Sequence, residues 1–285
     1  MSRIFDALQR SESAHTGLEV SEPETLGADL LTVREKEGEQ TSRIEEFTQV
    51  SIVPGDGTRL VSLTDPESLV AEKFRFLGVR LRQVQQNRGL KKLLITSTLA
   101  EEGKSMVSAN LAFTLARKKR QKVLLIDGDL RRPVLASRLG LGRTAGLVEW
   151  LHGEGTPAPP VYRLAETGVC LLPAGNPPEN PLELIQLPKL VGLLEKLATW
   201  FDWIVIDSPP VLPLADTSVW ARLCDAILLV AREGTSQRRE LKRGIEALDQ
   251  KKLLGMVVNS CTDADHTNYY QRYGPASNQA QRAAE

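Results

Sequence analysis

The chain of 285 residues contains only three cysteines and few aromatic residues, and its formal net charge is zero. Cys170, Cys224 and Cys261 are isolated and odd in number, so we expect buried free thiols and neither a disulfide framework nor a metal site. A net charge of zero gives the whole chain no attraction to nucleic acid, and no such partner is expected. Because it has no signal peptide and no apolar run of about 18 residues, we expect a cytoplasmic protein without a membrane span of its own.

The charge is uneven along the chain. Residues 11–50 hold ten acidic residues against three basic ones, a net charge of −7 that predicts a disordered linker. Before it, residues 2–10 give one apolar face to a short helix, which is either a docking helix or a frayed terminus. We therefore expect an N-terminal extension over residues 1–60, a folded domain over 61–262 and a flexible tail over 263–285.

A phosphate-loop pattern follows an apolar segment at residues 91–97. It ends in Gly103, Lys104 and Ser105 and leads into a predicted amphipathic helix, which is the context that a phosphate loop requires. In such a loop, backbone N–H groups at the helix start bind phosphate oxygens, the lysine reaches the β- and γ-phosphates and the serine binds Mg²⁺. The sequence therefore predicts a site for ATP and Mg²⁺ made by Glu101, Glu102, Gly103, Lys104, Ser105 and Met106.

Two residues depart from the phosphate-loop pattern. Thr98 stands where the pattern has its first glycine, and Glu101 stands where a small residue would let the anion approach most easily. A Gly-Lys-Ser triplet by itself is as easily an ordinary helix start. The strand before it and the helix after it favour the phosphate loop.

Acidic residues end two further apolar segments. Residues 123–126 lead into Asp127 and Asp129, and residues 203–206 lead into Asp207. Such continuous apolar runs are typical of strands buried on both faces of a parallel sheet. A lone aspartate after a strand is most often a cap or turn residue. Because the C-terminal ends of parallel strands share one edge, we expect the three strand ends to meet at one Mg-nucleotide, with Ser105 and Asp207 as metal ligands, directly or through water.

These segments predict the fold class: a doubly wound, mostly parallel α/β sheet with helices on both faces, as in P-loop NTPases, preceded by a disordered extension. Further strands are expected at 169–173, 226–231 and 253–259, and helices at 188–199, 216–223 and 236–250.

Residues 103–105, 126–133 and 206–210 together resemble the Walker A, A′ and B motifs of the bacterial protein-tyrosine kinases of capsule and exopolysaccharide synthesis. The resemblance covers about residues 66–275, with further matches at 172–175, 177–181, 225–230 and 255–259. It implies that Lys104, Asp127 and Asp129 are catalytic: Asp127 as the base that accepts the phenolic proton, and Asp129 as an aid to the metal or the acceptor. Arg131 or Arg132 steadies phosphate or a neighbouring subunit, or is a solvated residue at a helix start.

Three of the four tyrosines, Tyr269, Tyr270 and Tyr273, lie in the last 17 residues. Their surroundings are polar and lack apolar periodicity, so the tail has no evident core for which it would need aromatic residues. The alternative is a small aromatic cluster that anchors the terminus. In the kinases that this chain resembles, a C-terminal tyrosine cluster is the site of autophosphorylation, and we expect these three to be the acceptors, with transfer between subunits.

The resemblance also implies partners and an assembly. It implies a membrane-spanning polysaccharide co-polymerase or chain-length adaptor, which would place the chain at the inner membrane, together with a protein-tyrosine phosphatase and self-assembly into a homo-oligomer. A helix is expected to open at Asp65 and Pro66. In its Glu-x-x-Arg-x-x-Arg motif, Gly78 replaces the second arginine, and Arg82, one turn beyond on the same face, is a candidate substitute.

Two other functions stay open at this stage. Partitioning-type ATPases share the predicted sheet and hydrolyse ATP to control dimerisation, but their loop has an additional lysine where this chain has Leu99. A non-catalytic nucleotide-binding regulator is the third hypothesis, because the carboxylate of Glu101 would repel phosphate. The leading hypothesis is a tyrosine autokinase that regulates polysaccharide synthesis and export.

Overall fold

The computed structural model describes residues 44–55, 58–117, 121–153 and 158–260. All of these residues belong to a compact unit that begins at Ile44. The expected N-terminal helix, most of the acidic segment and the tail with its three tyrosines lie outside the described residues.

The described residues form one eight-stranded sheet with the strand order β1-β4-β5-β3-β6-β2-β7-β8. Neighbouring strands are parallel except for the antiparallel pair β4 and β5, so the prediction of a mostly parallel sheet is confirmed. The strands are β1 (Thr48–Val50), β2 (Lys92–Ser97), β3 (Val123–Asp127), β4 (Tyr162–Leu164), β5 (Val169–Leu172), β6 (Trp203–Asp207), β7 (Ala226–Arg232) and β8 (Leu253–Asn259).

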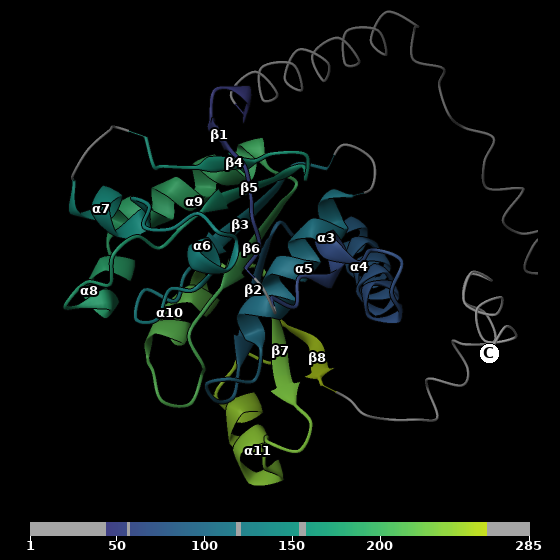
Figure 1. The fold of residues 1–285 in the computed structure, drawn as a ribbon. Helices are drawn as coiled ribbons and strands as arrows, with labels where there is room; N and C mark the ends of the chain where they lie inside the picture. The colour runs from purple at the N-terminus through teal and green to yellow at the C-terminus, as the bar shows by residue number, and fades with distance from the viewer. Residues whose placement is uncertain (1–43, 56–57, 118–120, 154–157, 261–285) are drawn as a thin grey trace, which may run out of the picture. The chain divides into compact units, whose positions relative to one another are not determined.

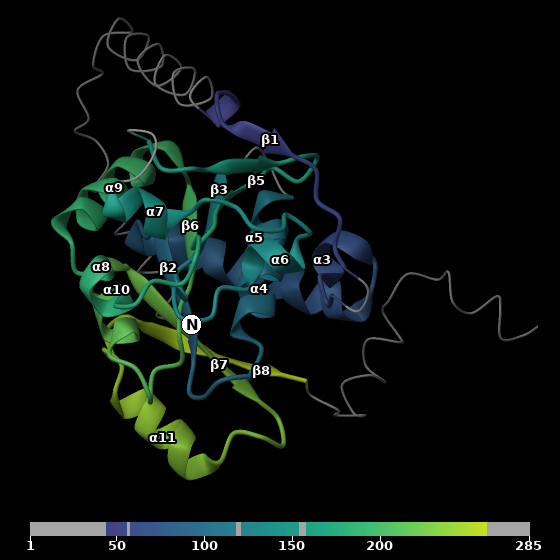
Figure 2. The same ribbon diagram turned by 60° about the vertical axis from the view of Figure 1, so that its left-hand side comes forward.

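Helices cover both faces of the sheet (Figure 1), and the turned view in Figure 2 shows the same two layers. The helices are α3 (Val61–Thr64), α4 (Leu69–Arg88), α5 (Lys104–Ala116), α6 (Leu135–Arg138), α7 (Leu147–His152), α8 (Pro181–Ile185), α9 (Pro188–Trp200), α10 (Asp216–Leu223) and α11 (Arg238–Glu246). None of the helices among these described residues is long and apolar enough to cross a membrane.

The core has two halves because successive side chains of a strand point to opposite faces of the sheet. In β2, Leu94 belongs to the cluster packed under α7, α8, α9 and α10, whereas Leu93 and Ile95 belong to the cluster under α4 and α5. All three are fully buried. Burial on both faces explains why the central strands read as continuous apolar runs rather than as alternating patterns.

The folded part of the chain begins earlier than the sequence predicts. The expected boundary at residue 60 is wrong, because β1 lies within the segment expected to be disordered and pairs with β4. Phe47 stacks on Phe201 with ring centroids 6.4 Å apart and lies 6.2 Å from the ring of Trp200. These aromatic contacts and the strand pairing hold residues 44–50 on the domain despite their acidic sequence neighbours.

Two helix ends also differ from expectation. α4 begins at Leu69 rather than at Pro66, because the Ser68 hydroxyl accepts a hydrogen bond from the Ala71 N–H at 3.2 Å and caps the helix there. α11 spans Arg238–Glu246, which is shorter at both ends than the expected 236–250. Its start is delayed because Ser236 belongs to a tight turn after β7, in which its N–H bonds to the Arg232 carbonyl at 3.1 Å.

Candidate functional site

The phosphate-loop segment joins β2 to α5 at the C-terminal edge of the sheet. Gly103 caps α5 with φ +93°, a left-handed conformation that favours glycine. A side chain there would also collide with the Asn259 amide, since an added Cβ would lie 2.1 Å from its nitrogen. α5 then begins at Lys104, so its first N–H groups have no intrahelical partner and form an anion site at the positive end of the helix dipole.

Lys104 lies among carboxylates brought from two neighbouring strands. Its Nζ donates to Asp129 Oδ2 at 2.8 Å and lies 3.8 Å from Asp207 Oδ2. Burial disfavours the charged lysine, but the carboxylates of Asp207 and Asp129 outweigh that effect and raise the pKa of Lys104. The ammonium group is therefore fixed at the site and charged, as a ligand for phosphate has to be.

Asp127 and Asp207 end the adjacent strands β3 and β6 and are paired in register. Asp127 Oδ2 accepts hydrogen bonds from the N–H groups of Val134 at 3.1 Å and Leu135 at 3.0 Å, while Oδ1 is buried with no hydrogen-bond partner among the described residues. Burial and the nearby charge of Asp207 raise the pKa of Asp127 to about 7. A carboxyl group with such a pKa can take up a proton at neutral pH.

Asp207 is fully buried, and hydroxyl groups on α5 contact its carboxylate. Its Oδ1 accepts from the Ser108 hydroxyl at 3.2 Å, and the Ser105 hydroxyl also bonds to its carboxylate. Oδ2 has no hydrogen-bond partner within the described part of the chain and has only the ammonium of Lys104 nearby. Burial is the main reason that the pKa of Asp207 is raised.

The donor set fits a magnesium ion. Mg²⁺ prefers oxygen ligands and usually keeps substrate phosphates and waters around one or two carboxylates. The unpartnered oxygen of Asp207 and the Ser105 hydroxyl provide such oxygens, and Asp129 contributes another carboxylate beside Lys104. No group of three or more Asp, Glu, His or Cys side chains suited to a metal ion occurs among the described residues, so the remaining ligands would have to come from nucleotide and water.

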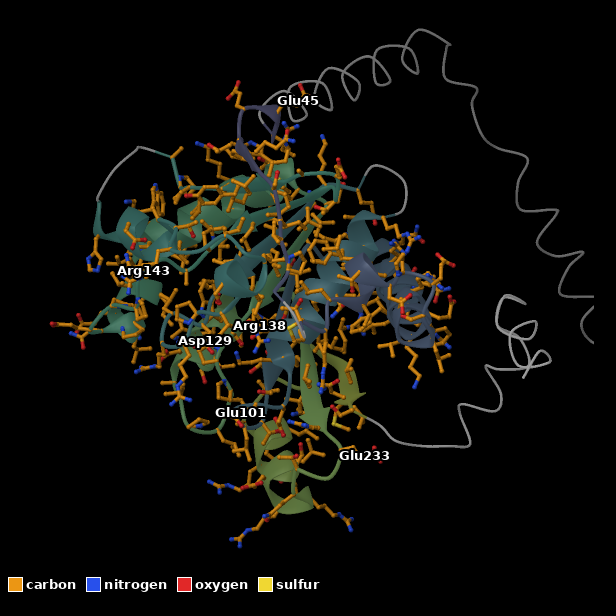
Figure 3. All side chains as sticks on the ribbon, viewed as in Figure 1. Glu45, Glu101, Asp129, Arg138, Arg143 and Glu233 are labelled. Carbon is orange, nitrogen blue, oxygen red and sulfur yellow. The ribbon has the colours of Figure 1, made fainter. Side chains whose placement is uncertain are left out.

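The two glutamates of the loop point in different directions. Glu101 is exposed and has φ +65°, a left-handed conformation that is strained for a residue with a side chain. Its side chain lies at the lower edge of the domain beside α11 (Figure 3), and its carbonyl accepts from Arg232 Nη1 at 3.4 Å. Glu102 is fully buried, and its carboxylate bonds to the Leu99 N–H at 2.8 Å. Only Glu101 therefore presents its carboxylate to solvent at the loop.

Thr98 replaces the first glycine of the loop pattern because a glycine on α11 leaves it room. A Cβ added at Gly244 would lie 2.9 Å from Thr98 Oγ1 and 3.1 Å from Thr98 Cγ2. The absence of a side chain at position 244 therefore leaves room for the Thr98 side chain. Met106, the last residue of the expected nucleotide set, lies in the first turn of α5 and packs partly against the core.

The arginine pair after β3 has divided roles. The Arg131 guanidinium bonds to both carboxylate oxygens of the buried Asp216 at the start of α10, at 2.8 and 3.0 Å. This bidentate pair fixes the Arg131 guanidinium at the start of α10, so Arg131 binds Asp216 rather than phosphate. Arg132 is exposed, and its backbone N–H donates to Asp129 Oδ1 at 3.1 Å.

The assembly motif on α4 differs from expectation. Arg82 does not extend outward to replace the missing arginine, because it donates to Gln121 at 3.0 Å and to the carbonyls of Thr114 and Leu115 at 3.2 Å. Gly78 is buried against α5, where an added Cβ would lie 3.2 Å from the Thr114 methyl. Helices α4 and α5 pack closely here, so the glycine serves the fold of the single chain.

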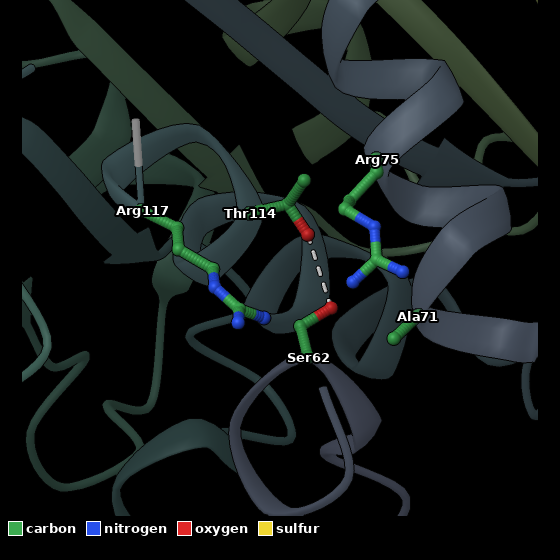
Figure 4. A pocket seen from close by; sticks show the side chains of 5 residues that line it. All are labelled: Ser62, Ala71, Arg75, Thr114 and Arg117. Carbon is green, nitrogen blue, oxygen red and sulfur yellow. Dashed lines mark hydrogen bonds between the residues drawn. The ribbon is translucent and has the colours of Figure 1, made fainter. Parts of the chain in front are cut away.

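A small pocket lies beside this helix contact, away from the phosphate loop (Figure 4). It is lined by Ser62, Ala71, Arg75, Thr114 and Arg117, and its volume of about 10 Å³ is near the size that holds one water molecule. Arg75 is bonded to Glu72 and to the Pro66 carbonyl, and Arg117 lies 3.3 Å from Glu67. The pocket is too small for a nucleotide, and its two arginines already bond to other groups of the chain.

Four contributors to the site were missed by sequence reasoning. Ser108 could have been found, because it lies one helical turn after Lys104. Asp216 and Ser236 carry no local signal, since each acts through a contact with a distant segment. Asn259 lies in a segment that resembles the kinases, but the sequence does not indicate its contact with the loop. Asn259 Nδ2, at the end of β8, donates to the Glu102 carbonyl at 3.0 Å. The end of β8 therefore lies beside the phosphate loop.

Comparison with known proteins agrees with this geometry. The family described as "CobQ/CobB/MinD/ParA nucleotide binding domain" matches residues 93–274. The tyrosine-protein kinase YwqD of Bacillus subtilis (strain 168) is 31% identical over 225 residues, which are 78% of this chain and 94% of YwqD.

Two solved structures resemble the fold closely. The chimerical protein CapA2B2 has a TM-score of 0.68 and 27% identity, with 80% of this chain and 100% of that chain covered. The kinase domain of the Escherichia coli tyrosine kinase ETK has a TM-score of 0.68 and 28% identity, with 75% and 83% covered. Since a bacterial tyrosine kinase is matched over nearly its whole length, this chain belongs to the bacterial tyrosine-protein kinases and to the wider CobQ/CobB/MinD/ParA nucleotide-binding family.

Proposed function

We propose that this chain is an ATP-dependent protein-tyrosine autokinase whose acceptors are the tyrosines of its C-terminal tail. The observation that carries the proposal is the meeting of Lys104, Asp127, Asp129 and Asp207 at one phosphate loop. Relatives of the chain carry the names tyrosine-protein kinase YwqD and putative tyrosine-protein kinase CapB. The tail tyrosines, Tyr269, Tyr270 and Tyr273, are proposed from sequence.

In the proposed reaction, the tyrosine oxygen attacks the γ-phosphorus of ATP, the bond from that phosphorus to the bridging oxygen breaks, and ADP leaves. Asp127 receives the phenolic proton, and its pKa of about 7 suits a base that works at neutral pH. An unperturbed tyrosine has a pKa of about 10 and is a weak nucleophile without such a base. Asp127 thus provides a proton acceptor within the site.

The phosphates would be bound by the N–H groups at the start of α5 and by Lys104. Lys104 is bonded to Asp129, so phosphate would share or replace that carboxylate as the partner of the ammonium group. Ser105, Asp207 and the carboxylate of Asp129 would hold Mg²⁺. When bound, Mg²⁺ neutralises phosphate charge during transfer.

The starting point of the tail bears on which chain is labelled. Tyr269 lies nine residues beyond Ser260, and an extended chain of that length spans about 30 Å. Because Asn259 contacts the phosphate loop, this reach includes the chain's own site. Transfer between subunits therefore depends on an assembly and is not required by distance alone.

The cellular setting is proposed from the relatives. They include the succinoglycan biosynthesis transport protein ExoP of Rhizobium meliloti (strain 1021). We place this chain at the cytoplasmic face of the inner membrane, bound to a membrane-spanning polysaccharide co-polymerase or chain-length adaptor. It would control capsular or exopolysaccharide synthesis and export. It would also form a homo-oligomer, and a protein-tyrosine phosphatase would remove the phosphate from its tyrosines. In this proposal residues 44–262 form the kinase domain, preceded by a linker and followed by the tyrosine tail.

A partitioning-type ATPase is the second candidate function. The observation that favours it is membership of a domain family that includes MinD and ParA. Against it, position 99 is a leucine, whose N–H bonds to Glu102, and it carries no ammonium group for a partner's nucleotide. This alternative predicts steady phosphate release without phosphotyrosine.

One experiment separates the candidates. The full chain is incubated with ATP labelled at the γ-phosphate and with Mg²⁺, with and without an adaptor fragment, and both protein-bound label and free phosphate are counted. An autokinase gives label on tyrosine that Lys104→Met abolishes. Free phosphate without labelled protein would establish the ATPase instead, and neither product would establish a non-catalytic regulator.

A further inference from the structure

Glu102 is a buried carboxylate inside a loop that has to receive phosphate. Its side chain turns away from the anion site: one oxygen accepts from the Leu99 N–H at 2.8 Å, and the other accepts from the Ser236 hydroxyl. Ser236 is more than a hundred residues away in the sequence, in the turn between β7 and α11. Within the described residues, this hydroxyl is the only side-chain donor to the Glu102 carboxylate.

Ser236 is itself fixed before it reaches the loop. Its Oγ accepts from the Arg232 N–H at 2.9 Å, and its own N–H donates to the Arg232 carbonyl at 3.1 Å. The hydroxyl proton is thereby left for Glu102. A chain of hydrogen bonds therefore links the end of β7 to Ser236, Glu102 and Leu99. Hydrogen bonds in such a chain polarise and strengthen one another.

The backbone of Glu102 is anchored separately. Its carbonyl accepts from Asn259 Nδ2 at 3.0 Å, and the carbonyl of the preceding Glu101 accepts from Arg232 at 3.4 Å. Loss of the Ser236 hydroxyl would leave one carboxylate oxygen of Glu102 without a donor and the other held only by the Leu99 N–H, while the loop backbone kept its supports. A buried carboxylate oxygen without a partner is costly, so the released side chain would turn outward to water.

We infer that Ser236 is a positioning residue for nucleotide binding: it keeps the Glu102 carboxylate out of the phosphate site. This inference rests on the proposed function, because it requires MgATP at the loop. With Glu101 already exposed there, an outward Glu102 would add a second negative charge beside the phosphates. The turn after β7 thus controls whether the nucleotide phosphates face one or two negatively charged side chains at the loop.

The test measures the Kd of MgATP for the full chain by calorimetry. Ser236→Ala should weaken binding about tenfold, from loss of a hydrogen bond to a charged group and the added repulsion. Thr235→Ala, which removes the neighbouring exposed hydroxyl, is the matched control and should bind like the wild type. In the double variant Ser236→Ala/Glu102→Gln the released side chain has no charge, so affinity should return to within about threefold of the wild type.

Each outcome has one meaning. An unchanged Kd for Ser236→Ala overturns the inference, and so does a double variant that binds no better than the single one, because a purely structural role would not respond to the charge of residue 102. A nucleotide-free Ser236→Ala chain that no longer melts cooperatively would assign Ser236 to the fold and also contradict it. A wild type that does not bind MgATP would overturn the proposed function, and the inference with it.

Discussion

The carboxyl groups of Asp127 and Asp207 occupy paired positions on β3 and β6, and each has one buried oxygen without a hydrogen-bond partner among the described residues. Two adjacent buried acids with spare oxygens are costly for the fold alone. The arrangement is explained if the two carboxyl groups bind a cation and one of them takes up a proton. Lys104 provides part of the positive charge in the nucleotide-free chain.

The raised pKa of Asp127 predicts how stability depends on pH. The unfolded aspartate loses its proton near pH 4 and the folded one near pH 7, so between these values the folded chain binds more protons. The free energy of unfolding should therefore fall, by a few kcal/mol, as the pH rises through this window, and stay lower above it. The raised pKa of Asp207 acts in the same direction.

Asp127→Asn checks this prediction, because asparagine does not titrate. Urea unfolding of the nucleotide-free variant between about pH 5 and pH 8 should show a shallower fall than the wild type, and higher stability at the alkaline end. An equally steep fall in both proteins would mean that Asp127 does not hold its proton in the folded chain.

Glu101→Gly should tighten MgATP binding several-fold and raise stability by about 1 kcal/mol, because glycine adopts a positive φ without strain and carries no charge. Glu166 is a matched control, since it is also an exposed glutamate with a positive φ, 62°, but lies in the turn between β4 and β5. Glu166→Gly should gain similar stability and leave the Kd of MgATP unchanged. Equal effects of both variants on Kd would show that the charge at Glu101 is irrelevant.

Lys104→Met should reduce MgATP affinity at least about a hundredfold, because it removes an ammonium group that bonds to Asp129 and lies 3.8 Å from Asp207. It also leaves Asp129 and Asp207 without their cation, so the variant should lose about 3 kcal/mol of stability at neutral pH. Calorimetry and thermal melting measure the two effects. A variant that melts like the wild type would mean that the Lys104 ammonium group does not stabilise these acids in the folded chain.

Mixing two inactive partners distinguishes transfer within a chain from transfer between chains. A Lys104→Met chain retains the tail tyrosines, and a chain with Tyr269, Tyr270 and Tyr273 all changed to Phe retains the site. Label on the Lys104→Met chain requires transfer between chains, and dilution should then slow it. If the mixture stays unlabelled while the wild type is labelled, transfer occurs within one chain, as the short distance from Asn259 to the loop permits.

Much of the site could be predicted from the sequence because its residues lie at strand ends. Apolar runs such as 123–126 fix strands, and parallel pairing brings the acids that follow them to one edge. Asp127, Asp129 and Asp207 were predicted in this way to meet at one edge, and Lys104 was predicted from the phosphate-loop pattern; the structure places these side chains together.

What the sequence could not predict depends on distant contacts. The inward turn of Glu102 needs Ser236, and the commitment of Arg131 needs Asp216, and neither pair has a sequence spacing that indicates it. β1 was missed because a three-residue edge strand in an acidic stretch has no periodicity to detect. Its place depends on pairing with β4 and on the rings beside Phe47.

The most direct test of the account is mass spectrometry of the tail after incubation of the full chain with MgATP and the adaptor. We predict phosphate on Tyr269, Tyr270 or Tyr273 in the wild type, a loss of at least about a hundredfold in the rate for Asp127→Asn, and none for Lys104→Met. Tail peptides without phosphate in a wild type that binds and consumes ATP would contradict the account.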